Sequence, residues 1–128
     1  MSEVPINREK RVRHNKITYV ELAASDLEKT KTFYNRVFGW NFNDYGPEYT
    51  AFEGRSVDCG FFKSDAVSTT KNGAALVVLY SEALEETEKK VVNAGGALTK
   101  EIFSFPGGRR FQFTDPNGNE LAVWSDAE

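Results

Sequence analysis

The chain has almost none of the residues on which most metal and nucleophile chemistry depends. Its 128 residues include one cysteine and one histidine. The single Cys59 excludes a disulfide within the chain, and the single His14, close to the N-terminus, leaves the body without Ser-His-Asp or Cys-His machinery. No apolar run reaches membrane-spanning length, and the first residues lack the apolar core of a signal peptide. We therefore expect a soluble, cytoplasmic protein.

Charge is distributed unevenly along the chain. The formal net charge is −3, yet residues 1–16 carry five Lys/Arg against two Glu, which leaves −6 for residues 17–128. A basic tail could contact nucleic acid or an anionic surface. The body, however, offers no basic stripe beyond Arg109 and Arg110. We therefore expect a solvated or partner-packed N-terminal arm, with neither nucleic acid nor a membrane as a partner.

The clearest structural signal is the stretch 105–124, FPGGRRFQFTDPNGNELAVW, which predicts two strands joined by a turn. Residues 115–118 fit a type I turn followed by a left-handed glycine. A one-residue bulge at Gly118 then places Phe113 opposite Leu121. One face becomes wholly apolar, and the mixed face is where we expect function. The apolar face holds Phe111, Phe113, Leu121 and Val123, and the mixed face holds Arg110, Gln112, Thr114, Glu120, Ala122 and Trp124.

A strand followed by an amphipathic helix is expected near the N-terminus. Residues 17–22 are rich in β-branched and aromatic side chains, which is typical of a strand. Ser25 should cap the helix, with Glu28 completing a capping box, and Gly39 should end it. Helical spacing predicts one buried face. That face consists of Leu27, Thr30, Phe33, Tyr34, Val37 and Phe38.

Short strands should follow at residues 40–43, 48–53 and 57–62, and the polar, aperiodic residues 64–72 indicate a linker. The second half repeats this order. It predicts a strand at 74–80, a helix at 82–93, a strand at 97–103 and then the hairpin.

Matching residues recur at a constant offset of 57 positions: Leu22 with Leu79, Leu27 with Leu84, and Gly39 with Gly96. We interpret this as two copies of a strand-helix-strand-strand-strand unit, an α+β fold of paired βαβββ modules. Each helix must cover one sheet face, which leaves the other face concave and partly polar, the default place for a ligand. The expected divisions are an arm at 1–16, a first module at 17–63, a linker at 64–72 and a second module at 73–128.

This arrangement resembles the vicinal oxygen chelate superfamily of glyoxalases, bleomycin-resistance proteins and dioxygenases. The resemblance rests on residues 17–40 (ITYVELAASDLEKTKTFYNRVFGW), 95–101 (GGALTKE) and the hairpin at 105–124. It implies paired βαβββ modules and frequent homodimers. In metal-dependent members it also implies His and Glu ligands on the concave sheet.

Most of the metal ligands that the resemblance implies are absent from this sequence. The resemblance places the two histidines at Tyr19 and Leu76, the final glutamate at Ala122, and the first-module glutamate at either Asp58 or Gly60. Catalytic metal sites generally use three protein ligands, and at most one survives here. We therefore expect neither a metal nor another cofactor.

Several side chains on the predicted open faces are candidates for binding. Glu21, which shares a strand face with Tyr19, could act as a general base or ligand acceptor, or pair with Arg110 or a lysine. Arg110 could clamp a carboxylate or phosphate, or lie flat on Trp124. Tyr19 and Trp124 would offer stacking surfaces to a planar ligand, or simply belong to the core.

Three further features have ordinary structural explanations. Glu120 lies close to the turn and is expected to be wet. Gly107 and Gly108 could cradle an anion, although two adjacent glycines are usually only a loop. Cys59 should be a small buried hydrophobe, because no histidine accompanies it as a nucleophile would require.

The sequence therefore favours a protein that binds a small organic molecule in a concave cleft without a catalytic metal. Two alternatives stay open: a metal-dependent lyase, isomerase or dioxygenase using Asp58, Glu21 or Glu120, and a structural or regulatory dimerisation module. We expect a homodimer, because an identical partner could cover the exposed strand edges. The predicted ligand-binding residues are Tyr19, Glu21, Arg110, Gln112, Glu120 and Trp124.

Overall fold

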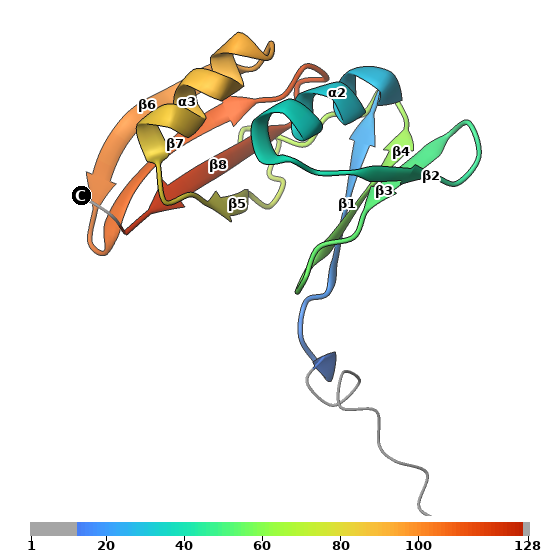
Figure 1. The fold of residues 1–128 in the computed structure, drawn as a ribbon, viewed down its shortest axis with the longest axis horizontal. Helices are drawn as coiled ribbons and strands as arrows, with labels where there is room; N and C mark the ends of the chain where they lie inside the picture. Colours follow the sequence, from blue (N-terminus) through green and yellow to red (C-terminus); the bar gives the residue numbers. More distant parts are fainter. Residues whose placement is uncertain (1–12, 127–128) are drawn as a thin grey trace, which may run out of the picture.

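The computed structural model describes residues 13–126 and contains two βαβββ modules side by side (Figure 1). The fold predicted from the sequence is confirmed. The first module comprises β1 (Tyr19–Ala24), α2 (Leu27–Phe38), β2 (Phe42–Asp44), β3 (Tyr49–Phe52) and β4 (Asp58–Lys63). The second comprises β5 (Val77–Tyr80), α3 (Leu84–Asn93), β6 (Ala97–Phe105), β7 (Gly108–Thr114) and β8 (Glu120–Ser125).

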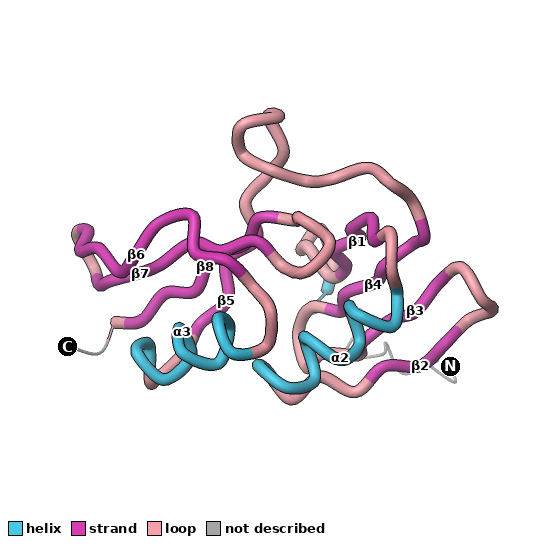
Figure 2. The backbone as a smooth tube through the Cα atoms, turned by 90° about the horizontal axis from the view of Figure 1, so that it is seen from above, coloured by secondary structure: helices cyan, strands magenta, loops and turns pink. Residues whose placement is uncertain are grey.

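Each module forms one four-stranded mixed sheet. The strand orders are β1-β4-β3-β2 and β5-β8-β7-β6, so that the first strand of each module is an edge strand. That strand runs parallel to its neighbour, whereas the other pairs are antiparallel. Seen from above, both helices lie on one side of the sheets, and the loop that joins the modules lies on the other (Figure 2).

The β7-β8 hairpin has the predicted register. Phe113 lies opposite Leu121 and Phe111 opposite Val123, and all four side chains are buried. Gly118 has a φ of 95°, a left-handed conformation that a side chain would strain. Alternation along the strands and the turn chemistry therefore agree on one arrangement.

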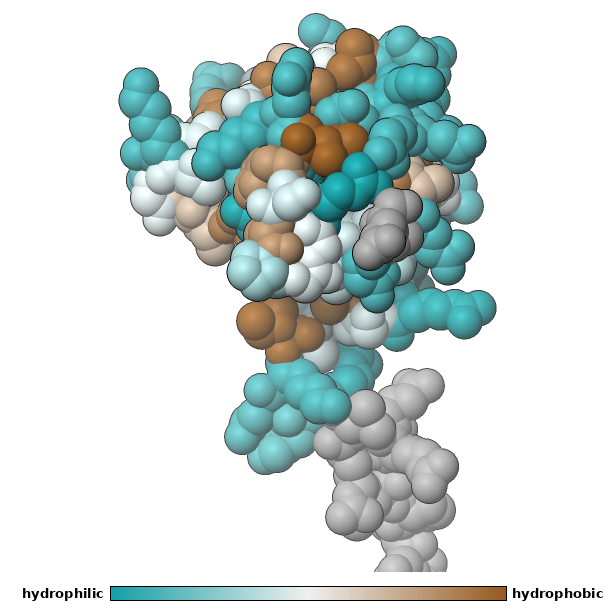
Figure 3. All heavy atoms as spheres, turned by 90° about the vertical axis from the view of Figure 1, so that its left-hand side faces the viewer, coloured by the Kyte–Doolittle hydropathy of each residue, from teal (hydrophilic) through white to brown (hydrophobic). Residues whose placement is uncertain are grey.

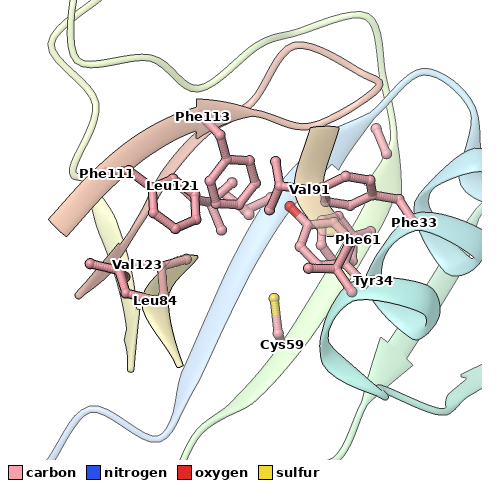
Figure 4. Packing of buried hydrophobic residues seen from close by; sticks show 13 residues of the cluster. Phe33, Tyr34, Cys59, Phe61, Leu84, Val91, Phe111, Phe113, Leu121 and Val123 are labelled. Carbon is pink, nitrogen blue, oxygen red and sulfur yellow. The ribbon is translucent and has the colours of Figure 1, made fainter. Parts of the chain in front are cut away.

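One apolar core runs through both modules (Figure 4). Phe33 and Tyr34 of α2 pack edge to face, with ring centroids 5.0 Å apart. Phe33 also lies 5.9 Å from Phe113 of the second module, measured between ring centroids. Val91 of α3 is fully buried in the same cluster. The modules therefore share their hydrophobic stabilisation and should unfold together.

The turn between β7 and β8 fastens the second module to the first. The Asp115 carboxylate accepts a hydrogen bond from the Tyr34 hydroxyl at 2.8 Å. The Asn119 side-chain amide donates to the backbone carbonyl of Ala23 at 2.6 Å. These side chains are buried, so losing either partner would leave a polar group unsatisfied.

The start of the first helix differs from the prediction. Asp26, not Ser25, is the N-cap, because its carboxylate accepts from the backbone N–H of Lys29 at 3.1 Å. The Ser25 hydroxyl instead donates to the side-chain carbonyl of Asn117 at 3.1 Å. The predicted capping box of Ser25 and Glu28 is therefore wrong, because a residue of the other module engages the serine.

The surface at the end of the molecule formed by the second module mixes hydrophilic residues with small apolar groups (Figure 3). Within residues 13–126, none of the helices is long and apolar enough to cross a membrane. The basic arm predicted at residues 1–16 lies largely outside the described residues.

Candidate functional site

A cluster of hydroxyl and carboxylate groups occupies the face of the first sheet opposite α2, which we call the open face. Tyr19 and Glu21 extend from β1, and Tyr49 extends from β3. The hydroxyls of Tyr19 and Tyr49 share a hydrogen bond, and the Tyr49 hydroxyl donates to Glu21 Oε2 at 2.9 Å. The structure thus joins two predicted residues through Tyr49, which the sequence analysis missed. We call these three residues the tyrosine cluster.

Gly60 of β4 makes room for the tyrosine cluster. It pairs with Glu21 on one side and with Ala51 on the other, so it lies in the middle of the sheet. A Cβ atom at this position would overlap the hydroxyl oxygens of both Tyr19 and Tyr49. Only glycine allows the two hydroxyls to meet here. A glycine inside a strand is a sequence signal for such a close approach.

Strand pairing identifies which first-module residue corresponds to Ala122. In the second module, Ala122 pairs with Val78. The residue 57 positions before Val78 is Glu21, and Glu21 pairs with Gly60. The first-module glutamate position implied by the resemblance therefore falls at Gly60 and not at Asp58.

The four implied metal-ligand positions are thus Tyr19, Gly60, Leu76 and Ala122. Glycine, leucine and alanine side chains offer no donor atom, and a tyrosine alone does not make a divalent metal site. Among residues 13–126, no three His, Cys, Asp or Glu side chains lie close enough together to hold a metal. The residues present do not fit the metal that the resemblance implies.

A hollow of about 320 Å³ lies beside the tyrosine cluster. Burial, together with the hydrogen bonds to Tyr19 and Glu21, raises the pKa of Tyr49 well above its ordinary value. Tyr49 therefore keeps its proton at neutral pH. The hollow is lined by three tyrosines, two carboxylates and two apolar residues: Tyr19, Tyr45, Tyr49, Glu53, Asp58, Ala51 and Phe52.

A larger hollow of about 900 Å³ lies between residues 13–18 and the β3-β4 connection. It shares Glu53 and Asp58 with the smaller hollow, and Arg13, Lys16 and Arg55 also line it. These three basic side chains are exposed. The larger hollow is therefore an open space beside the N-terminal residues, whereas the smaller one contains the converging polar groups.

Arg110 of the second module lies over two phenylalanine rings. Its Cζ atom is 5.2 Å from the ring centroid of Phe103 and 5.9 Å from that of Phe105. The alternative in which Arg110 lies flat on Trp124 is not observed in the described chain, because the guanidinium lies over Phe103 and Phe105 and the Trp124 ring contacts those of Tyr80 and Phe105. Arg110 Nε is buried and has no hydrogen-bond partner among residues 13–126.

The prediction that Glu120 is exposed to solvent is wrong. It is 9% exposed, and its carboxylate accepts hydrogen bonds from the Thr70 hydroxyl at 2.6 Å, the Thr99 hydroxyl at 3.0 Å and Gln112 Nε2 at 3.2 Å. The hydrogen bond from the Thr70 hydroxyl does most to hold the pKa of Glu120 below its ordinary value. Glu120 and Gln112 thus anchor the segment between the modules to β8.

The six predicted residues therefore do not form one cluster. Tyr19 and Glu21 share no hydrogen bond, ion pair or ring contact with Arg110 or Trp124 within the described chain. The alternative in which Glu21 pairs with Arg110 or a lysine is wrong, because Glu21 has no ion pair among residues 13–126. Of the six, Tyr19 lines the hollow of about 320 Å³, together with Tyr49 of the tyrosine cluster.

Two other candidates have structural roles. Burial, with a smaller effect of Asp115, raises the pKa of Cys59 to about 12, so its thiol is not a ready nucleophile. Gly107 has a φ of 112° in the β6-β7 turn, and a side chain at Gly108 would overlap the backbone oxygen of Ser125. These glycines are therefore required by the hairpin itself.

Comparisons with known proteins agree with this fold. The sequence model of the Glyoxalase/Bleomycin resistance protein/Dioxygenase superfamily matches residues 16–123. No curated protein matches the chain. A glyoxalase-related enzyme from Fulvimarina pelagi is similar with a TM-score of 0.74 and 18% identity, over 87% of this chain and 88% of that one.

Two further solved structures carry more specific names. The fosfomycin resistance protein FosX from Listeria monocytogenes has a TM-score of 0.71 and 17% identity, over 87% of this chain and 93% of that one. The lactoylglutathione lyase from Agrobacterium tumefaciens has a TM-score of 0.66 and 19% identity, with the same coverage of 87% and 93%. At these identities the likeness shows the fold alone.

Proposed function

Because the chain belongs to the glyoxalase/bleomycin resistance protein/dioxygenase superfamily, we propose that it binds a small organic molecule on the open face of its first module, without a catalytic metal. The tyrosine cluster above Gly60 carries this proposal. Its three polar groups meet beside a hollow rather than in the core, where they would contribute to packing. The chain shares its fold with proteins named for small molecules, among them the lactoylglutathione lyase and the fosfomycin resistance protein.

Native mass spectrometry of the freshly purified protein tests the proposal. We expect a small molecule to copurify with the wild type and to be lost from Tyr19→Phe, which removes one hydroxyl of the cluster. Tyr80→Phe is the matched control, because Tyr80 is an exposed tyrosine of the second module whose hydroxyl donates to Asp126. If the ligand were lost from Tyr80→Phe and retained by Tyr19→Phe, the site would lie in the second module and the proposal would be wrong.

The main alternative is a metal-dependent lyase, isomerase or dioxygenase of the same superfamily. It would need donors that Gly60, Leu76 and Ala122 do not supply. Elemental analysis should find no molar equivalent of Zn, Ni, Mn or Fe. A molar equivalent that is lost on mutating Glu21 or Asp58 would favour the alternative.

A purely structural or regulatory dimerisation module is the other alternative, and it would bind no ligand at all. A homodimer and a cytoplasmic location are part of our proposal as expectations from the sequence. Light scattering at tens of micromolar, a concentration at which even a dimer of about 1 μM Kd is mostly assembled, tests the homodimer.

A further inference from the structure

We propose that the molecule bound at the tyrosine cluster is an organic cation with N–H groups, such as an ammonium carried by an aromatic or apolar body. This rests on the proposed function, since it names the class of ligand taken by the same site. The direction of the hydrogen bonds, the charge of the hollow and the aromatic rings around it point to the same class.

The hydrogen bonds of the tyrosine cluster run in one direction. A carboxylate only accepts, so Tyr49 gives its single hydroxyl proton to Glu21. In the bond that the two hydroxyls share, Tyr49 must then accept, and Tyr19 donates its own proton. The Tyr19 oxygen is left with only lone pairs to offer the hollow. A ligand that reaches this oxygen must itself donate a hydrogen bond.

The charge of the hollow is negative. Among residues 13–126, its lining contains Glu53 and Asp58 and no Lys, Arg or His. The carboxylate of Glu21 adds to this charge from outside the lining, where it accepts a hydrogen bond from the lining residue Tyr49. Asp58 Oδ1 accepts from the backbone N–H of Gly54 at 3.0 Å, which orients this carboxylate without neutralising it. A positively charged ligand is therefore favoured over an anionic one.

The basic side chains that line the larger hollow form no ion pair with these carboxylates. Arg13, Lys16 and Arg55 line the larger hollow, which shares Glu53 and Asp58. Yet neither carboxylate forms an ion pair within residues 13–126, where the ion pairs involve Lys31 and Arg109 instead. The negative charge remains available to a ligand.

Aromatic rings complete the site. Tyr45 and Tyr19 are 59% and 45% exposed, so their rings are open to a ligand. The rings of Tyr45 and Tyr49 meet at 62°, with centroids 6.4 Å apart, and form a corner of the hollow. The faces of such rings attract cations, and the attraction grows when carboxylates stand nearby.

Four benzyl probes separate the contributions: benzylammonium, benzyltrimethylammonium, benzyl alcohol and benzoate. Each is titrated into the full-length protein, and the amide chemical shifts of β1 and Gly60 report binding at this site. Benzylammonium should bind about tenfold more tightly than benzyl alcohol, because a hydrogen bond to a charged group contributes more than a neutral one. Benzyltrimethylammonium, which keeps the charge but has no N–H, should lie between them, and benzoate should not bind here.

Variants then assign the contacts. Tyr19→Phe should weaken the binding of benzylammonium about fivefold and leave the binding of benzyltrimethylammonium nearly unchanged, because only benzylammonium donates a hydrogen bond to the Tyr19 hydroxyl. Asp58→Asn should weaken both cations by a similar factor. Glu101→Gln is the matched control for charge, since Glu101 is exposed on β6 and its carboxylate has no hydrogen bond or ion pair within the described chain. Denaturant midpoints establish that each variant is folded.

Three results would overturn the inference: benzoate or benzyl alcohol binding as tightly as benzylammonium, equal losses for both cations in Tyr19→Phe, or no shift with any probe at millimolar concentration. The proposed function fails separately. A neutral or anionic copurified ligand that depends on Tyr19 would uphold the proposed function and refute the cation. If neither copurified molecules nor probes engage the open face, both are refuted.

Discussion

The two modules have the same order of elements but differ on their open faces. Both helices begin at residues 57 positions apart, Leu27 and Leu84, and both sheets have the same strand order. Yet the open face of the first sheet carries tyrosine hydroxyls and a carboxylate around Gly60. On the corresponding face of the second sheet, Arg110 lies over the rings of two phenylalanines. The helix-covered sides of the two modules are therefore alike, whereas the opposite faces of the two sheets differ.

The equivalent small residues Gly60 and Ala122 make this contrast concrete. Above Gly60, two tyrosine hydroxyls fill the space and remain beside a hollow. Ala122 is fully buried and lies opposite Gln112, whose amide contacts Glu120 in the cluster that anchors the linker. The same position therefore supports a candidate binding site in one module and a structural anchor in the other.

The largest effect on stability is expected in the core that the two modules share. Phe113→Ala removes a ring that contacts α2 of the first module, so we expect a loss of roughly 3–5 kcal/mol in the free energy of unfolding. Because the core is shared, denaturation followed by fluorescence and by circular dichroism should give one common transition. Two separate transitions would mean that the modules are energetically independent.

A second perturbation addresses the tyrosine cluster. Gly60→Ala should cost about 1–3 kcal/mol, because the added methyl group overlaps two hydroxyls. In a Tyr49→Ala background the same substitution should cost clearly less. A double-mutant cycle of denaturant midpoints measures this coupling. Equal costs in the two backgrounds would show that the tyrosines do not impose the glycine.

A third perturbation addresses the anchor of the second module. Glu120→Gln should cost about 1–3 kcal/mol at neutral pH, because it replaces one accepting carboxylate oxygen by an NH2 group, which cannot accept the hydrogen bonds from Thr99 and Gln112. The folded-state pKa of Glu120 is lowered, so its stabilisation is complete above the unfolded-state value and is lost as the pH falls through the folded one.

The difference in stability between wild type and Glu120→Gln should therefore be widest at neutral pH. It should narrow as the pH falls below 4.5, the ordinary glutamate value. Urea midpoints from pH 7 to pH 3 test the sign. A difference that grows towards acid pH would contradict the hydrogen bonds assigned to this carboxylate.

The smallest effect on stability is expected for Arg110→Ala. Its guanidinium lies over the rings of Phe103 and Phe105 and forms no ion pair in the described chain, so the free energy of unfolding should change by less than about 1 kcal/mol. Any binding of phosphate or benzoate by the second module, measured through the amide shifts of β7, should nevertheless be weakened. Unfolding of this variant would mean that the two faces of the hairpin were assigned the wrong way round.

Local patterns predicted the fold well. The register of Phe113 against Leu121 followed from alternation and from the turn at residues 115–118, both of which act over a few positions. The helix end at Gly39 followed from its left-handed conformation. Distant partners determined what the sequence analysis missed. Asn117 engages Ser25, and Thr70 covers Glu120 from 50 positions away.

The candidate site was only partly predictable for the same reason. Strand parity placed Tyr19 and Glu21 on one face, but the residue that connects them comes from β3, which is two strands away in the sheet. The glycine at position 60, inside a predicted strand, was the available signal. It indicated a close approach without naming Tyr49 as the side chain that makes it.

The turn that fastens the modules also constrains the order in which the chain can fold as it is synthesised. Asp115 reaches back 81 positions to Tyr34, and Asn119 reaches back 96 positions to Ala23. On the ribosome, the first module emerges long before these side chains exist. Until the last hairpin has left the exit tunnel, the Tyr34 hydroxyl and the Ala23 carbonyl can form hydrogen bonds only with water. The first module is therefore synthesised first, but its native hydrogen bonds are among the last to form.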